Sequence, residues 1–230
     1  MTDIPSHRLN KHLALQLGIS RREADMLIEK RSVTINDAPA TLGARFKDGD
    51  TISVNGTPLG PATEYTYLLL NKPVGYVCSR RTQGDNETIY ALLPKKYHVL
   101  KPVGRLDKDS SGLILLTNDG DFAFRMTHPK FHKTKVYDVQ LDHDLEPLHQ
   151  QMISDYGVQL EDGVSKLLLQ RQTDNSRREW QVTMHEGRNR QIRRTFAALG
   201  YTVTALHRRV FGPYSLGDIR PGEFITTTMR

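Results

Sequence analysis

The feature that most constrains the fold is a short apolar run between glycines near the middle of the chain. Residues 113–117 read Leu-Ile-Leu-Leu-Thr, after Gly112 and before an Asn-Asp-Gly turn at 118–120. A continuous apolar run of this length, bounded by turn signals, is typical of a strand buried on both faces. A polar loop leads into the run and carries Asp107. Catalytic side chains are often held on loops anchored to rigid strands, and a carboxylate can act as a nucleophile or a base.

Composition narrows the class of protein. The 230 residues suffice for one large domain, or for a small domain followed by a medium one. A formal net charge of +6 favours a polyanionic partner. The single cysteine excludes an internal disulfide and fits a reducing, cytoplasmic environment. The sequence contains no apolar run approaching the ~20 residues of a membrane span, so we expect no membrane association.

The first sixty residues predict a small module of two helices and short strands. A helical pattern ends at Gly18, and Ser20 with Glu23 forms a capping-box pattern at the start of a second helix. The order Arg-Leu-Asn-Lys, Gly-Ile-Ser-Arg-Arg-Glu-Ala and Val-Thr-Ile-Asn resembles an S4 RNA-binding domain. That resemblance implies RNA contacts from the basic residues on or beside the helices: Arg8, Lys11, Arg21 and Arg22. A solvated basic helix face without a partner is the alternative.

Residues 55–63 contain two glycines, two prolines and no charge, which indicates an interdomain linker. We therefore predict an S4-like domain at 1–60 and a second domain at 61–230. Strand patterns begin at Tyr67–Leu70 and continue at 76–79. Further strands are expected at 133–141, 158–160, 167–170 and 179–184.

The loop and strand around Asp107 also carry a family resemblance. Gly-Arg-Leu-Asp-x-x-Ser-x-Gly-Leu, beginning at Gly104, resembles the catalytic signature of the RsuA-type ribosomal RNA pseudouridine synthases. The resemblance covers residues 6–55 and 65–228, and it implies that Asp107 is the catalytic aspartate. It likewise implies that Tyr137, in a Lys-x-Tyr-x-Val run, is an active-site tyrosine. Without the resemblance, Asp107 could simply cap a tight turn.

An arginine-rich stretch, residues 186–200, predicts a helix that ends at Gly200. It resembles the third synthase motif, which implies that Arg193 is an active-site basic residue. We expect Arg193 to pair with Asp107 and keep it ionised and oriented. Leu206 lies where the family places an apolar residue under the target base. RNA contacts are expected from Arg105, Arg188, Arg190, Arg194 and Arg208, although an exposed basic helix is again the simpler alternative.

Together these features predict an α+β protein: an S4-like α/β module followed by a synthase domain with a largely antiparallel or mixed central sheet. The resemblance implies isomerisation of a specific uridine in ribosomal RNA to pseudouridine. The N1–C1′ bond breaks and a C5–C1′ bond forms, with no cofactor and no metal. Asp107 could attack C1′ or C6, or start an elimination. The expected partner is ribosomal RNA in a pre-ribosomal particle or partly folded, and the protein is expected to be monomeric.

Two other classes of function remain open from the sequence. The chain could be a non-catalytic RNA-binding or ribosome-assembly factor, in which Asp107 does no chemistry. A hydrolase or nuclease would instead use aspartates as metal ligands, and the candidates are Asp107, Asp109, Asp119 and Asp121. Sensitivity to a chelator separates the nuclease from the synthase.

Overall fold

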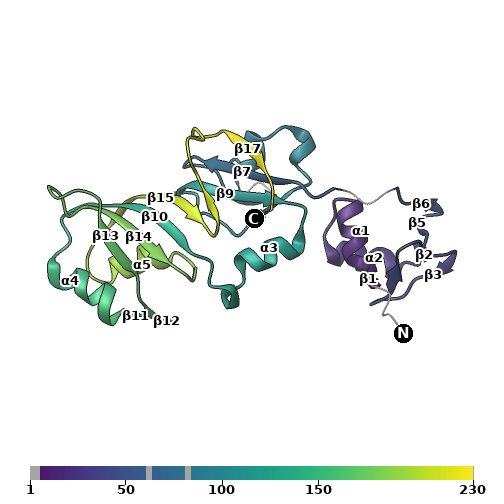
Figure 1. Ribbon diagram of the computed structural model, residues 1–230, viewed down its shortest axis with the longest axis horizontal. Helices are drawn as coiled ribbons and strands as arrows, with labels where there is room; N and C mark the ends of the chain where they lie inside the picture. Colours follow the sequence, from purple (N-terminus) through teal and green to yellow (C-terminus); the bar gives the residue numbers. More distant parts are fainter. Residues whose placement is uncertain (1–5, 61–63, 81–83, 230) are drawn as a thin grey trace. The chain divides into compact units, whose positions relative to one another are not determined.

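The computed structural model describes residues 6–60, 64–80 and 84–229, and its contacts divide the chain into two units, Met1–Tyr65 and Thr66–Arg230 (Figure 1). The predicted domain boundary after residue 60 remains a proposal, which the truncation described below tests. Residues 61–63 of the predicted linker lie outside the described residues.

The first unit contains two helices and two small sheets. Ser20 accepts a hydrogen bond from the Glu23 amide, and the Glu23 side chain accepts one from the Ser20 amide, so the predicted capping box is confirmed. Leu9, Leu13 and Ile28 are buried between the helices and strands. The elements are β1 (Ser6–Arg8), α1 (Leu9–Gln16), α2 (Arg21–Glu29), β2 (Val33–Ile35), β3 (Ala38–Pro39), β4 (Arg45–Lys47), β5 (Ile52–Val54) and β6 (Thr57–Pro58).

The predicted linker is wrong in its first half. Asn55 and Gly56 both have positive φ, 50° and 77°, and they join β5 to β6 as an antiparallel hairpin. Asn-Gly is favoured in two-residue hairpin turns because both positions tolerate positive φ. The glycine therefore belongs to a turn within the first unit.

The second unit is built on one mixed sheet with the strand order β13-β14-β10-β15-β9-β7-β17. Only the β15–β9 pair is parallel among the described strands, which confirms the predicted largely antiparallel sheet. In Figure 1 the last strand, β17, lies beside β7. The strands on this path are β7 (Tyr67–Lys72), β9 (Ser111–Thr117), β10 (Lys135–Leu141), β13 (Leu168–Arg171), β14 (Glu179–Met184), β15 (Val203–Phe211) and β17 (Phe224–Thr227). The short strands β8 (Lys101–Val103) and β16 (Tyr214–Ser215) pair with β9 and β15.

Strand β9 is the apolar run of the sequence, and it is buried on both faces as predicted. Ile114 and Leu116 belong to one core cluster, whereas Leu113 and Leu115 belong to another. The strand pairs with β7, β8 and β15. Its first residues are thus fixed by neighbours on both sides, which gives the loop before it a rigid support.

Two segments differ from the predicted secondary structure. Residues 76–79 do not form the predicted strand, since only an isolated bridge joins Val77 to Thr88. The arginine-rich helix begins only at Gln191, and Arg190 is a left-handed N-cap. The helices are α3 (Gly120–Thr127), α4 (Pro147–Gln151) and α5 (Gln191–Ala197), with shorter helical turns η1 (Ile89–Leu92), η2 (Lys95–Tyr97), η3 (Pro129–Phe131) and η4 (Met152–Tyr156).

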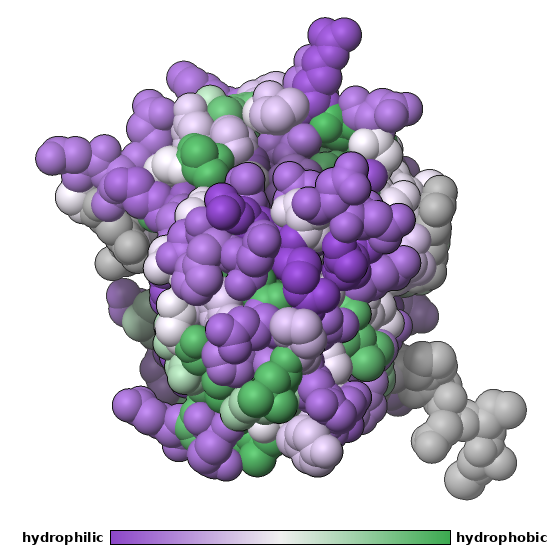
Figure 2. Space-filling view, turned by 90° about the vertical axis from the view of Figure 1, so that its left-hand side faces the viewer, coloured by the Kyte–Doolittle hydropathy of each residue, from purple (hydrophilic) through white to green (hydrophobic). Residues whose placement is uncertain are grey.

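One end of the second unit carries α4, η4, β13 and the hairpin of β11 (Val158–Leu160) and β12 (Gly163–Ser165). Figure 2 shows this end as a largely hydrophilic surface with separate apolar patches. Leu148, Val164 and Leu168 are the exposed aliphatic residues of these elements. Scattered apolar side chains of this kind are normal on a protein surface.

Candidate active site

The loop that carries Asp107 is fixed at both of its ends. Leu106 before it and Ser110 after it are buried, and the Ser110 amide donates to the Asp107 carbonyl. The Gly75 amide donates to the Lys108 carbonyl, which ties the loop to the turn after β7. Between these anchors the Asp107 side chain is about one-third exposed (34%). The carboxylate is therefore held in place and still open to a substrate.

Gly112 lets the backbones of β9 and β15 approach closely. It has φ +105°, and a Cβ atom there would lie 2.3 Å from the carbonyl oxygen of Arg208. In the parallel register Gly112 faces Arg208 directly. Because Asp107 and Arg208 flank this contact, the close approach brings the loop that carries Asp107 close to β15.

Gly112→Ala is expected to lower the unfolding free energy by roughly 3 kcal/mol or more, because a side chain meets backbone atoms and the positive φ is strained. The melting temperature should fall by about 6–12 °C for a protein of this size. Thermal unfolding followed by circular dichroism measures this. Gly187→Ala is the matched control, since its Cβ would meet nothing closer than 3.6 Å; equal melting temperatures for the two variants would contradict the close approach.

The predicted pair between Arg193 and Asp107 is wrong. Arg193 instead lies 3.3 Å from the Asp109 carboxylate and donates to the Asp109 carbonyl at 2.8 Å. Arg190 approaches Asp107 at 3.6 Å and binds both oxygens of Asp109, at 3.1 and 2.9 Å. The reason is the left-handed conformation of Arg190 (φ 46°), which removes it from the helix and directs it across the loop that carries Asp107.

Asp109 is the acceptor that joins these two arginines, and the sequence pattern did not assign it this role. The hydrogen bond from Arg190 is the main cause that holds the pKa of Asp109 below its ordinary value, with the charge of Arg193 adding to it. Asp109 therefore stays ionised and keeps one guanidinium next to Asp107. The sequence feature that could have indicated this role is a second carboxylate, two residues after Asp107, in a chain that also has an arginine-rich helix to pair with it.

Arg188 and Arg194, which were predicted to contact RNA, are both bound to acceptors within the protein. Arg194 binds both carboxylate oxygens of Asp162, at 3.0 and 2.6 Å. Arg188 donates to Asp162 and to the carbonyls of Gly163 and Val164, each at 2.9 Å. These contacts fasten the β11–β12 hairpin to α5 and to the segment before it. Periodicity alone could not reveal them, because the acceptors belong to a hairpin far away in the sequence.

A cleft of about 350 Å³ brings most of the predicted site residues together. Asp107 and Arg105 line it from the loop, and Tyr137 lines it from β10. Leu206 and Arg208 line it from β15, on which Arg208 is directly opposite Tyr137. The expected grouping of Asp107, Tyr137 and Leu206 is thus present. Arg208 is only 2% exposed, so the RNA contact predicted for it could be made only from within the cleft.

Lys72 is a buried cation near the site that the sequence pattern did not reveal. It is fully buried at the end of β7, and its ammonium donates to the Pro73 carbonyl at 2.9 Å. Burial lowers the pKa of Lys72, while the charges of Cys78, Asp109 and Asp107 partly oppose that shift. A lysine at the end of an apolar strand gives no sign of full burial in the sequence.

In the first unit, the predicted RNA-binding residues lie on or next to the two helices. Arg21 and Arg22 are exposed in the first turn of α2, Arg8 is exposed just before α1, and Lys11 is half-buried on α1. All four residues lie at the N-terminal ends of the two helices, where the helix dipole also favours an anion.

The four aspartates of the nuclease alternative do not meet. Asp107 and Asp109 precede β9, whereas Asp119 and Asp121 follow it, and a seven-residue strand spans roughly 23 Å. Asp119 accepts hydrogen bonds from two amides of α3 and from Tyr67. Over residues 6–60, 64–80 and 84–229 no cluster of three His, Cys, Asp or Glu side chains could hold a metal ion. In the same described residues, no helix is long and apolar enough to cross a membrane.

Comparison with known proteins identifies the family. The family described as RNA pseudouridylate synthase matches residues 66–198, and the S4 domain matches residues 7–52. The chain belongs to the RNA pseudouridylate synthase family. The resemblance drawn from the sequence and the expected enzyme class are therefore confirmed, and the protein is a pseudouridine synthase with an S4 RNA-binding domain.

The curated relatives of this pseudouridine synthase act on both ribosomal subunits by name. "Ribosomal small subunit pseudouridine synthase A" of Yersinia pestis is 36% identical over 94% of this chain and 93% of its own. "Ribosomal large subunit pseudouridine synthase B" of Bacillus subtilis is 34% identical over 94% of this chain and 90% of its own. A solved structure described as a pseudouridylate synthase aligns with TM-score 0.68 and 32% identity over 96% of both chains.

Proposed function

We propose that this synthase converts a specific uridine of ribosomal RNA to pseudouridine, with Asp107 as its catalytic carboxylate. The observation that carries the proposal is the placement of Asp107 on a fixed loop at the edge of a cleft that Tyr137 and Leu206 also line. Ribosomal RNA is supported as the substrate by the names of relatives that match the chain along nearly its whole length.

Each side chain of the site has a part in this proposal. The target uridine flips out of its stack and enters the cleft, since its C1′ and C5 atoms are inaccessible within a helix. Leu206 contacts one face of the base, and Tyr137 stacks on it or transfers a proton. Arg190 and Arg193, bound to Asp109, hold the loop and place a positive charge beside Asp107. The Asp107 carboxylate is then available as nucleophile or base.

The same proposal extends to partner and place. The S4 unit docks on ribosomal RNA, in a pre-ribosomal particle or partly folded, where the target uridine can still be reached. This interaction takes place in the cytoplasm, where a single unpaired cysteine is stable. The enzyme acts as a monomer, which the hydrophilic surface around α4 and β13 supports (Figure 2).

Mapping pseudouridine across both ribosomal RNAs tests the substrate. In cells that lack the gene, one site or a small set of neighbouring sites should lose pseudouridine, and the wild-type gene should restore it. Complementation with the Asp107→Asn gene should restore nothing. An unchanged map in the deletion strain would overturn ribosomal RNA as the substrate.

Deleting residues 1–60 is expected to weaken RNA binding and to leave the synthase unit folded. The slope of log affinity against log salt should become shallower by about one for each phosphate that the S4 unit binds. Filter binding at several salt concentrations measures the slope, and circular dichroism reports the fold. An unfolded truncation product would contradict the proposed domain boundary, while an unchanged salt slope would contradict RNA docking by the S4 unit.

A further inference from the structure

Arg208 is a buried cation with an unused donor. The side chain is 2% exposed, and its Nε donates to the Leu113 carbonyl at 2.7 Å. Its Nη2 has no hydrogen-bond partner within the described part of the chain. A buried guanidinium is costly unless it is paired, so this donor indicates a ligand that is present when the enzyme works. The guanidinium lines the cleft that also contains Asp107.

Lys135 provides a second cation at the same place. It is half-buried and lines the same cleft, and its ammonium donates to the Glu186 carbonyl at 3.1 Å. The Lys135 ammonium and the Arg208 guanidinium lie 5.4 and 4.8 Å from the centre of the same ring, that of Phe211. Burial is the main cause that lowers the pKa of Lys135, and the positive charge of Arg208 adds to it. Both cations thus lie beside one ring, and both residues line the same cleft.

No carboxylate among the described residues lies within 4 Å of either cation, because the nearby acids are engaged elsewhere. Asp109 is bound to Arg190, and the Glu186 carboxylate is 3.3 Å from Arg188. The charge of Glu186 acts on Lys135 only at longer range, where it partly opposes the lowering of the lysine pKa. Even with the Asp107 carboxylate of the same cleft counted, the two cations leave a net positive charge that a ligand can neutralise.

Ser110 adds an unsatisfied hydroxyl to the cleft. It is 1% exposed, it lines the cleft, and its hydroxyl has no partner in the described residues. Arg208, Ser110 and Lys135 thus line the same cleft as Tyr137 and Leu206, and the first two have a buried donor without an acceptor. This arrangement fits a ligand with acceptor oxygens and an apolar ring face.

Both the base and the phosphates of an RNA have oxygens that these groups could bind. How deeply the groups are buried decides between the two. When a nucleotide flips into a pocket, the base enters furthest and the phosphates stay at the mouth with the rest of the backbone. A guanidinium that is 2% exposed is therefore reached by the base. We propose that Lys135 and Arg208 form an oxygen-binding subsite for the target uracil, which stabilises the negative charge on the base when its glycosidic bond breaks.

The charge arises from the isomerisation itself. Cleavage of N1–C1′ leaves the electron pair on uracil, where it is shared between N1 and the carbonyl oxygens. The base turns, C5 bonds to C1′, the proton on C5 is lost, and N1 takes up a proton, so that composition is unchanged. Fixed donors aimed at developing charge in a water-poor site are among the strongest contributions to catalysis. Lys135 and Arg208 would also keep the detached base in the cleft while it turns.

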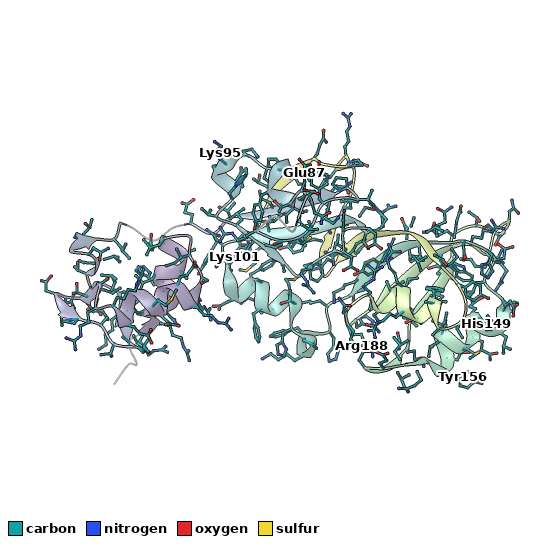
Figure 3. The ribbon with its side chains drawn as sticks, turned by 180° about the vertical axis from the view of Figure 1, so that it is seen from behind. Glu87, Lys95, Lys101, His149, Tyr156 and Arg188 are labelled. Atoms are coloured by element: carbon teal, nitrogen blue, oxygen red, sulfur yellow. The ribbon has the colours of Figure 1, made fainter. Side chains whose placement is uncertain are left out.

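The first test measures the single-turnover rate and RNA affinity of Lys135→Met, Lys135→Arg and Arg208→Lys. Loss of one donor of this kind slows other enzymes by about 10²–10³-fold, and a similar loss is expected for Lys135→Met, with RNA affinity nearly unchanged. Lys135→Arg and Arg208→Lys should keep part of the rate, because the charge remains. Lys95→Met is the matched control: Lys95 lies in η2, well away from the cleft residue Arg188 in Figure 3.

The outcomes separate three roles. A preserved rate with reduced affinity in Lys135→Met would make Lys135 a phosphate contact and overturn the proposal. Equal loss of activity in Lys135→Met and Lys135→Arg, with equally lowered melting temperatures, would make it a structural residue and overturn the proposal as well. Slow isomerisation in a stably folded Lys135→Met, partly restored in Lys135→Arg, supports the uracil subsite.

A second test changes the RNA. Neutral methylphosphonates replace the two phosphates that flank the target uridine, and the rate deficit of Lys135→Met is measured again. If the ligand is uracil, the deficit should be the same on both RNAs; a deficit that disappears on the neutral RNA identifies a phosphate as the ligand. The inference rests on pseudouridine formation and not on which RNA is used. A wild-type enzyme inactive on ribosomal RNA would overturn only the proposed substrate, and the same variants would test the subsite on any RNA that it isomerises.

Discussion

Asp107→Asn should abolish pseudouridine formation and leave RNA affinity within a few-fold of wild type. The two side chains have nearly the same shape, so the loop between Leu106 and Ser110 keeps its hydrogen bonds. The amide cannot act as a nucleophile or a base at neutral pH. Removal of an essential nucleophile or base from other enzymes lowers the rate by about 10⁴-fold or more, and the same order is expected here.

The measurement is a quenched time course of pseudouridine formation with enzyme in excess over RNA. Asp144→Asn is the matched control, because Asp144 makes a surface ion pair with Arg178 and does not line the cleft. The control should keep wild-type turnover. Turnover near the wild-type rate in Asp107→Asn would refute Asp107 as the catalytic residue. A large loss of RNA affinity would show that the main role of Asp107 is in RNA binding and not in catalysis.

The central strand could be predicted because its signal is local. Leu113 to Leu116 form an uninterrupted apolar run, and only a strand with a core on each side buries all four side chains. The capping box of Ser20 and Glu23 is local in the same way, since the two residues satisfy each other's amides. Asp107 became a candidate because its loop is adjacent to the run and carries the family signature, and its catalytic role stays a prediction.

The arginine pairing could not be predicted, because it depends on one backbone conformation. An ordinary helical geometry places Arg190 away from the sheet, and the sequence does not reveal that it adopts a left-handed φ of 46° instead. Arg188 and Lys72 are bound mainly by backbone carbonyls, and carbonyls leave no trace in the residue pattern. Pairs of charged side chains can be proposed from a sequence, whereas a backbone carbonyl acceptor can be identified only when the fold is known.

Arg193→Ala is expected to lower both the rate and the stability. Its side chain is only 13% exposed and joins two segments: it donates to the Val203 carbonyl at 2.6 Å and to the Asp109 carbonyl at 2.8 Å. Hydrogen bonds from a charged group contribute about 1.5–3 kcal/mol each. If the misplaced loop raises the activation free energy by about 3 kcal/mol, the reaction slows roughly a hundredfold. Arg193→Lys should recover part of the lost rate and stability, since lysine keeps the positive charge but lacks the planar guanidinium that donates to two acceptors at once.

Arg190→Ala and Arg194→Ala complete the comparison, because the three arginines have different contacts. Arg190 and Arg193 contact Asp109, whereas Arg194 binds Asp162. Arg190 and Asp107 are 43% and 34% exposed, so water screens the attraction between them. An exposed pair contributes up to about 1 kcal/mol, so Arg190→Ala should slow the reaction about fivefold. Its pair with Asp109 is exposed as well, so the melting temperature should fall only slightly. Arg194→Ala releases Asp162 and should leave the rate near wild type. Single-turnover rate, RNA affinity and melting temperature of all three variants decide the matter. If all three keep the wild-type rate and lose affinity alike, the arginines are phosphate contacts, and the proposed support of the Asp107 loop through Asp109 is refuted.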